Sequence, residues 1–205
     1  MAGPAVLTVA DTIARSFLRS VETRGDRPAI REKKFGIWQP TSWRHWLQTS
    51  RDIAFALHAT GFRPGDAASI LANAVPEWVY ADMGILCAGG VSSGIYPTDS
   101  SSQVEYLIND SSTRVIFAED EEQLDKILSC RSRCPTLHKI IVSDMEGLNA
   151  FSDPMVLSLA EFMALGRNHA QGREALCDEM IGSRTADDLA ILVYTSGTTG
   201  PPKGA

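Results

Sequence analysis

Residues 189–204 read LAILVYTSGTTGPPKG, an apolar run followed directly by a loop rich in glycine and hydroxyl groups. The apolar run, residues 189–194, is typical of a buried strand in a sheet that is covered on both faces. The loop, residues 195–204, has three glycines, four hydroxyl side chains, one lysine and no acidic residue. Glycines let backbone N–H groups approach an anion closely, and hydroxyls add neutral donors. The two segments therefore predict a buried strand that leads into a phosphate-binding loop.

Each type of residue in this phosphate loop, residues 195–204, has its own expected role. The hydroxyls would donate hydrogen bonds to phosphate oxygens, and the glycines would permit the approach of the backbone. Lys203 would place its charge against the outer phosphates of a nucleoside triphosphate and the leaving pyrophosphate, which makes it the predicted catalytic residue. The predicted ATP phosphate-binding residues are Thr195, Ser196, Gly197, Thr198, Thr199, Gly200, Lys203 and Gly204. A solvated surface turn is the alternative, but a turn does not require this combination behind a buried strand.

The spacing of the loop differs from two other phosphate-binding patterns. The pattern G-x-x-x-x-G-K-[ST] would require a glycine at Pro202 and a hydroxyl at Gly204, which argues against a kinase or GTPase of that kind. The dinucleotide pattern G-x-G-x-x-G does not fit the spacing of the three glycines either. A dinucleotide-binding enzyme is therefore not indicated.

Upstream of the loop, short apolar runs alternate with amphipathic segments of helical period. We expect Asp11 to cap a first helix that Gly25 ends, Ser42 to open a second helix that Gly61 closes, and a third helix to begin at Pro76. Further helices are expected at residues 103–109, 121–129, 157–165 and, with uncertain extent, 168–182. Strands are expected at residues 29–31, 37–39, 67–72, 91–96, 114–119, 138–144 and 189–194. This order predicts an α/β fold with right-handed crossovers, a mostly parallel sheet and helices on its faces.

The composition excludes some classes of function. The 205 residues include 25 acidic and 19 basic residues, a formal net charge of -6, which argues against a nucleic-acid partner. No run reaches the roughly 18 apolar residues of a membrane span, and no basic secretory leader is present. Four cysteines without such a leader favour a reducing compartment, so we expect a cytoplasmic protein, with peripheral membrane association left open.

Other groups of residues are weaker candidates for a functional site. Cys130 and Cys134 lie close to His138, but no second ligand pair supports a zinc site, and we predict no metal site. Residues 119–122, EDEE, fall at an expected helix start, where acidic side chains complement the helix dipole. The histidines and tryptophans are scattered, and we expect surface, capping or packing roles for them; they are His45, His58, His138, His169, Trp38, Trp43, Trp46 and Trp78.

Residues 195–204 resemble the phosphate loop T-S-G-[ST]-T-G-x-P-K-G of the adenylate-forming (AMP-binding) enzymes, with no departure from the pattern. This family includes acyl-CoA synthetases, luciferases and adenylation domains of peptide synthetases. Similar segments occur upstream in the same order, namely Gly65-Asp66, Asn73 with Glu77-Trp78, Ala88-Gly89-Gly90-Val91 and Tyr96-Pro97. Residues 94–110 and 115–128 are most similar to long-chain fatty acyl-CoA synthetases, including the bubblegum type. The resemblance covers nearly the whole chain.

The resemblance implies an activity in two half-reactions. A fatty acid carboxylate attacks the α-phosphate of Mg-ATP to give an acyl-adenylate and pyrophosphate, and the thiol of coenzyme A then displaces AMP. ATP, Mg²⁺ and coenzyme A are thus the implied cofactors and co-substrates, and the implied partners are small molecules. An aryl-CoA ligase, an amino acid adenylation domain and a non-catalytic, truncated ATP-binding relative remain alternatives.

Several parts of such an enzyme are missing from this sequence. The family also has an adenine-binding motif, an aspartate for the ribose, a hinge, and a lysine in a small C-terminal lid domain. None of these occurs in residues 1–205, which we interpret as an incomplete large N-terminal domain. We therefore expect the 205-residue chain to have little or no ligase activity by itself.

Overall fold

The computed structural model describes residues 11–173, 175–195 and 202–205. Its main element is a six-stranded parallel sheet with the strand order β7-β6-β5-β3-β4-β8. The six strands are β3 (Ala67–Leu71), β4 (Val91–Ile95), β5 (Val115–Ala118), β6 (Lys139–Val142), β7 (Val156–Ser158) and β8 (Ile191–Leu192). The expected α/β fold with a parallel sheet is therefore confirmed.

Seven α-helices and two small antiparallel pairs accompany the sheet in the described part of the chain. The helices are α1 (Ile13–Arg24), α2 (Trp43–Ala59), α3 (Pro76–Cys87), α4 (Ser101–Asp110), α5 (Glu121–Cys130), α6 (Leu159–Ala170) and α7 (Leu176–Gly182), and a 3-10 turn η1 (Arg131–Arg133) follows α5. The two pairs are β1 (Pro28–Lys34) with β2 (Ile37–Ser42), and β9 (Tyr194–Thr195) with β10 (Lys203–Gly204).

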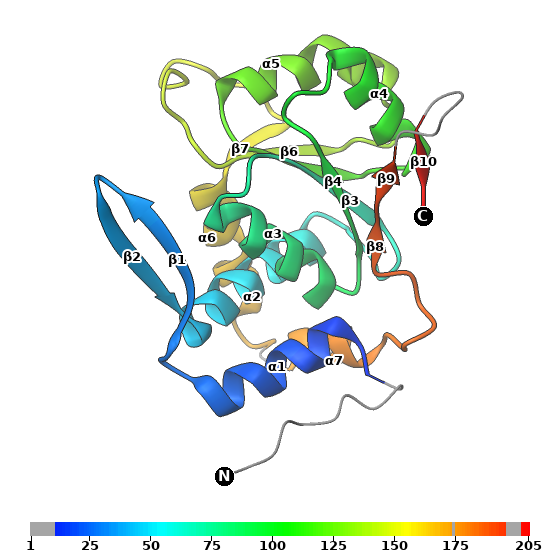
Figure 1. Cartoon of the computed structure of the whole chain (residues 1–205). Helices are drawn as coiled ribbons and strands as arrows, with labels where there is room; N and C mark the ends of the chain where they lie inside the picture. Colours follow the sequence, from blue (N-terminus) through cyan, green and yellow to red (C-terminus); the bar gives the residue numbers. More distant parts are fainter. Residues whose placement is uncertain (1–10, 174, 196–201) are drawn as a thin grey trace.

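The helices cover both faces of the sheet (Figure 1). Helices α2, α3 and α6 lie on one face, with α1 and α7 outside them, and α4 and α5 lie on the other face. The central strands β3 and β5 are buried along their whole length, because they are apolar and covered on both sides. Each face thus has its own hydrophobic core, and together the two cores fix the sheet that carries the candidate site.

Helices α2 and α6 cross at close range. Gly166 of α6 lies against the backbone of α2, where an added Cβ atom would stand 1.9 Å from the carbonyl oxygen of Asp52. Beside it, the guanidinium of Arg167 donates a 2.8 Å hydrogen bond to the Asp52 carboxylate. The absence of a side chain at Gly166 therefore sets the distance between these two helices.

Most expected boundaries are confirmed, and the start of α1 is corrected. Ser42 caps α2 by accepting from the His45 N–H, and α3 begins at Pro76 as expected. The N-cap of α1, however, is Thr12 and not Asp11, because the Thr12 hydroxyl accepts from the Arg15 N–H. Asp11 instead forms a 2.6 Å ion pair with Arg19.

Three expectations in the second half of the chain are wrong in part. The short edge strand β7 precedes α6, where we expected helix from residue 157. The helix expected at 168–182 is two segments, the end of α6 and α7. Residues 189–194 are no buried strand, since the side chains of Leu189, Ile191 and Val193 are 52%, 38% and 54% exposed. The cause is position: among the residues that the structure describes, β8 is an edge strand whose one partner is β4.

Candidate nucleotide-binding site

The two ends of the phosphate loop are joined as a small antiparallel ladder. Strand β9 pairs with β10 so that Thr195 lies opposite Lys203 and Tyr194 lies opposite Gly204. Val193 and Ala205 extend this ladder by exchanging two 3.1 Å backbone hydrogen bonds. The structure therefore brings together two predicted phosphate ligands, Thr195 and Lys203, which are both exposed to solvent.

The middle of the loop lies outside the described residues. The predicted ligands Ser196, Gly197, Thr198, Thr199 and Gly200 belong to this part, so their contacts with phosphate stay predictions. Gly204, the third predicted ligand that the structure describes, has a packing role. A Cβ atom there would lie 3.2 Å from Cζ of Tyr194, so the glycine makes room for the tyrosine ring.

The ladder stands at the carboxyl edge of the parallel sheet. A pocket of about 540 Å³ opens beside it, between the ends of β3, β4 and β8. Ligand sites of open α/β sheets lie at this edge. The pocket is lined by Ala72, Asn73, Ala74, Trp78, Val79, Ser92, Gly94, Ile95, Tyr96, Pro97, Ile191, Leu192, Val193 and Tyr194. Sequence reasoning expected only a packing role for Trp78, which packs on the core and also forms a wall of this pocket.

A half-buried carboxyl group is bonded to Ser92, one of the residues that line the pocket. Asp82 of α3 is hydrogen-bonded to Ser92, and its buried Oδ1 atom has no hydrogen-bond partner among the described residues. Burial raises the pKa of Asp82, although the hydrogen bond with Ser92 opposes this effect. Sequence reasoning did not single out this residue, because a lone aspartate in a helix gives no signal of its depth.

Two side chains of α4 contact the loop ladder, and sequence reasoning missed both as site residues. The Tyr106 hydroxyl donates a 2.9 Å hydrogen bond to the carbonyl oxygen of Pro202. The Tyr194 hydroxyl donates a 2.8 Å hydrogen bond to the Asp110 carboxylate. These partners are far apart in the sequence, and only the topology of the sheet, which puts α4 beside β9 and β10, brings them together (Figure 1).

The acidic run at residues 119–122 has the structural role expected from the sequence. Asp120 is the N-cap of α5 and accepts from the Gln123 N–H, with Glu121 and Glu122 in the first turn. Glu119 accepts from the backbone and side-chain nitrogens of Asn73. Among the residues that the structure describes, no three histidine, cysteine or acidic side chains come together as a metal site.

Two histidines form a pair that the sequence did not reveal. Nδ1 of His58 in α2 lies 3.0 Å from Nε2 of His169 in α6, so one ring donates a hydrogen bond to the other. This contact requires at least one neutral ring. Burial and the nearby charges of Arg63 and Arg173 lower the pKa of His58, and burial and Arg173 lower the pKa of His169.

We expect this histidine pair to make the stability of the chain pH-dependent. Because the folded-state pKa values are lowered, the unfolded state binds more protons, so stability is full above the ordinary histidine pKa of about 6.5 and falls as the pH drops below it. Urea unfolding at pH 7.5 and 5.5 should show that His169→Gln loses less free energy of unfolding between these two pH values than the unchanged chain does. His138→Gln, which replaces an exposed histidine, is the control and should leave the loss unchanged. An equal loss of stability in all three proteins would show that the pair of His58 and His169 does not cause the pH dependence.

The fold and the loop define the class of protein, and comparison with known families agrees. A family model described as AMP-binding enzyme matches residues 17–205. The chain therefore belongs to the AMP-binding, or adenylate-forming, enzyme family, as the resemblance of residues 195–204 predicted. In the described part of the chain, no helix has the length and apolar character needed to span a membrane.

Among individual proteins, the chain is similar to long-chain-fatty-acid–CoA ligases. It is 32% identical over 193 residues to the ligase ACSBG1 of Homo sapiens. The matched region covers 94% of this chain and 26% of that protein. It is also 32% identical to the ligase ACSBG2 of Xenopus laevis, over 94% of this chain and 25% of that protein. The expected likeness to long-chain fatty acyl-CoA synthetases is confirmed, and the chain spans about a quarter of the length of these relatives.

Solved structures share the fold. The anthranilate CoA ligase AuaEII in complex with anthranoyl-AMP superposes with a TM-score of 0.75 and 22% identity, over 97% of this chain and 35% of that one. The acetoacetyl-CoA synthetase from Streptomyces lividans gives a TM-score of 0.71 and 22% identity, over 93% of this chain and 29% of that one. At these identities the likeness concerns the fold alone.

Proposed function

We propose that this chain is the phosphate-binding part of an AMP-forming ligase that activates a long-chain fatty acid and transfers it to coenzyme A. The observation that carries the proposal is the unbroken match of residues 195–204 to the family's phosphate loop. The closing ladder of this loop stands beside a pocket at the carboxyl edge of the sheet, where α/β proteins bind ligands. The named relatives support the fatty acid as the substrate.

In the first half-reaction, a carboxylate oxygen forms a bond to the α-phosphorus of ATP, and the bond to the bridging oxygen of pyrophosphate breaks. Negative charge grows on the leaving pyrophosphate, and such a displacement needs held and neutralised phosphates more than a covalent catalyst. Lys203 is exposed and therefore free to reach the outer phosphates. The backbone of Lys203 pairs with that of Thr195, and this pairing fixes its position at the end of the loop.

In the second half-reaction, the thiol of coenzyme A attacks the acyl carbonyl, and AMP leaves. Magnesium would enter as the Mg-ATP complex, held mainly by phosphate oxygens, which is its usual mode in nucleotide sites. We assign no residue of this chain to coenzyme A or to the acyl tail. By itself the 205-residue chain should form no measurable acyl-CoA, since it spans about a quarter of its relatives.

The first experiment is an assay of AMP release by the product of the longest reading frame that contains residues 1–205. It uses palmitate, acetate and benzoate in separate reactions, each with Mg-ATP and coenzyme A. Release that depends on palmitate is the expected result. Release only with benzoate or acetate would replace the fatty acid by another acid, and no release with any acid would overturn the ligase proposal.

A further inference from the structure

The last turns of α4 hold both arms of the phosphate loop. On the closing arm, the Tyr106 hydroxyl donates to the carbonyl oxygen of Pro202 at 2.9 Å. On the opening arm, the Tyr194 hydroxyl donates to Oδ2 of Asp110 at 2.8 Å. Tyr106 and Asp110 are one helical turn apart, so they face the ladder from the same side of α4. One helix thus contacts Tyr194, which precedes the predicted phosphate ligands, and Pro202, which lies directly before Lys203.

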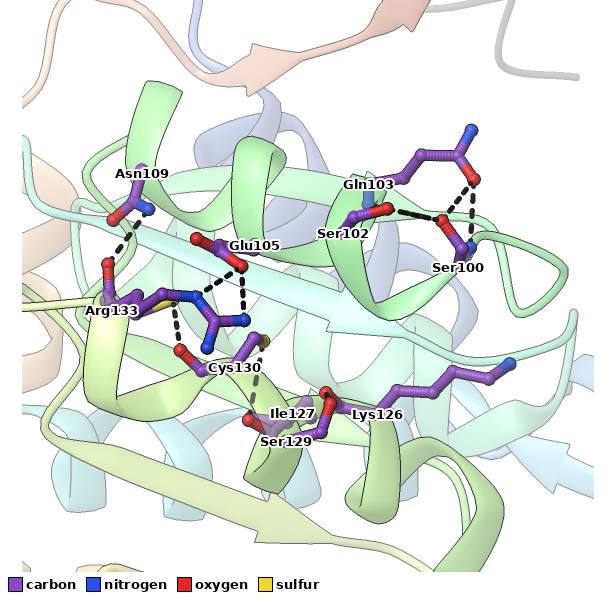
Figure 2. A network of polar contacts seen from close by, with 11 residues as sticks. Ser100, Ser102, Gln103, Glu105, Asn109, Lys126, Ile127, Ser129, Cys130 and Arg133 are labelled. Carbon is purple, nitrogen blue, oxygen red and sulfur yellow. Dashed lines mark hydrogen bonds and ion pairs between the residues drawn. The ribbon is translucent and has the colours of Figure 1, made fainter.

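This helix is itself anchored at several points (Figure 2). At its start, Ser100 and Gln103 form a capping box in which each side chain bonds to the backbone of the other. In its middle, the Glu105 carboxylate accepts from two nitrogens of Arg133 at 2.9 and 2.6 Å, and Asn109 donates to the Arg133 carbonyl oxygen at 3.1 Å. Figure 2 shows these contacts tying α4 to the turn that follows α5. The helix is therefore a fixed support for the loop.

The hairpin that closes the loop needs such a support. Its described ladder consists of two residue pairs and the two hydrogen bonds between Val193 and Ala205. A two-stranded pair of this length is only marginally stable in water. The Tyr194 ring, which rests against Gly204, and the Tyr106 hydroxyl add contacts from outside the ladder. The ladder would keep its register through these contacts to α4.

Tyr194 is the donor in its hydrogen bond with Asp110. Burial, the hydrogen bond with Asp110 and its charge all raise the pKa of Tyr194, so the phenol keeps its proton and donates it. The Tyr106 hydroxyl also lies 3.5 Å from Oδ1 of Asp110, but its shorter contact is the one with Pro202. The carboxylate and the two hydroxyls form one chain of polar contacts across the base of the loop.

We propose that Tyr106 and Asp110 are positioning residues that hold the two arms of the phosphate loop in the spacing needed to bind the triphosphate of ATP. They touch no substrate, and they act through Pro202 and Tyr194. The inference rests on the proposed function of the loop, because an effect on ATP requires that the loop binds phosphate. Pre-organised donors bind an anion better than donors that must first be ordered.

The first test measures the ladder without nucleotide. Amide hydrogen exchange of Val193 and Ala205 is followed by NMR in the 205-residue chain and in Tyr106→Phe and Asp110→Ala. Loss of one hydrogen bond should speed exchange at these amides about fivefold. Tyr80→Phe is the matched control, because its hydroxyl bonds to Thr41 at 3.1 Å, far from the loop, and it should leave these amides unchanged. Unchanged exchange in both α4 variants would overturn the anchoring.

The second test measures the KM for ATP of the product of the longest reading frame. Tyr106→Phe and Asp110→Ala should raise the KM for ATP about fivefold, whereas Tyr80→Phe should not. Asp110→Asn, which keeps an oxygen that can accept from Tyr194, should restore most of the affinity lost in Asp110→Ala. Faster amide exchange with an unchanged KM would overturn the positioning role. If the unchanged protein does not use ATP at all, the proposed function fails, while the exchange data still judge the anchoring separately.

Discussion

Replacement of Lys203 by alanine is expected to lower the rate of ATP-dependent AMP release about 100-fold, the usual effect of removing one group that stabilises transition-state charge. Lys203 is the only cation in residues 195–204, and its backbone is held opposite Thr195. Without its charge, the outer phosphates would lose their partner as pyrophosphate departs. The measurement is steady-state AMP release with palmitate by the product of the longest reading frame.

Lys33→Ala is the matched control for this change. Lys33 is an exposed lysine in β1, on a hairpin that lies away from β9 and β10 (Figure 1). Its removal changes the net charge by the same amount but should leave AMP release within about twofold, as exposed substitutions away from a site usually do. Equal rates for Lys203→Ala and the unchanged protein would show that the catalytic assignment of Lys203 is wrong.

Replacement of Gly166 by alanine is expected to lower the free energy of unfolding by about 3 kcal/mol, the upper part of the usual range for overpacking. The new Cβ would meet the carbonyl oxygen of Asp52 at 1.9 Å and the amide nitrogen of Ala56 at 3.0 Å. Both are backbone atoms that cannot rotate away. Helices α2 and α6 would have to separate, which would also disturb the bond between Arg167 and Asp52. Urea unfolding of the 205-residue chain measures the loss.

Gly182→Ala is the control for the glycine replacement. Gly182 ends α7, and a Cβ atom added there would meet nothing within 4 Å. This variant should keep its stability within about 0.5 kcal/mol of the unchanged chain. If Gly166→Ala were equally harmless, the close approach of α2 and α6 described above would be wrong.

Much of the sheet could be predicted from local patterns. The strands β3, β4, β5 and β6 are short apolar runs between amphipathic helices, and their sequences show this without any knowledge of their neighbours. Caps with clear chemistry, such as Ser42, were also found. The error at Asp11 and Thr12 arose because two adjacent residues can both cap a helix, and Asp11 instead pairs with Arg19, about two turns further on.

The remaining features depend on position in the sheet and not on local pattern. The run at residues 189–194 is as apolar as a central strand, but β8 lies at the edge, so its alternate side chains are exposed. Strand β7 is only three residues long and carries almost no periodic signal. At the candidate site, the phosphate-binding roles of residues 195–204 stay predictions from their order, and the structure adds the pairing of Thr195 with Lys203. The supports Tyr106 and Asp110 could not, since their partners Pro202 and Tyr194 join them only after the fold has formed.

The order of the strands along the chain has a consequence for synthesis on the ribosome. The first five strands of the parallel sheet to be synthesised, β3 to β7, form one continuous part of it. Strand β8 joins the free edge of β4 only after residues 96–190 have been made. Domains generally fold from the N-terminal side during translation. A nascent chain can therefore complete most of its core, and the helix that supports the loop, before the strand that leads into the loop leaves the exit tunnel. Strands β9 and β10 would then pair against a core that has already formed.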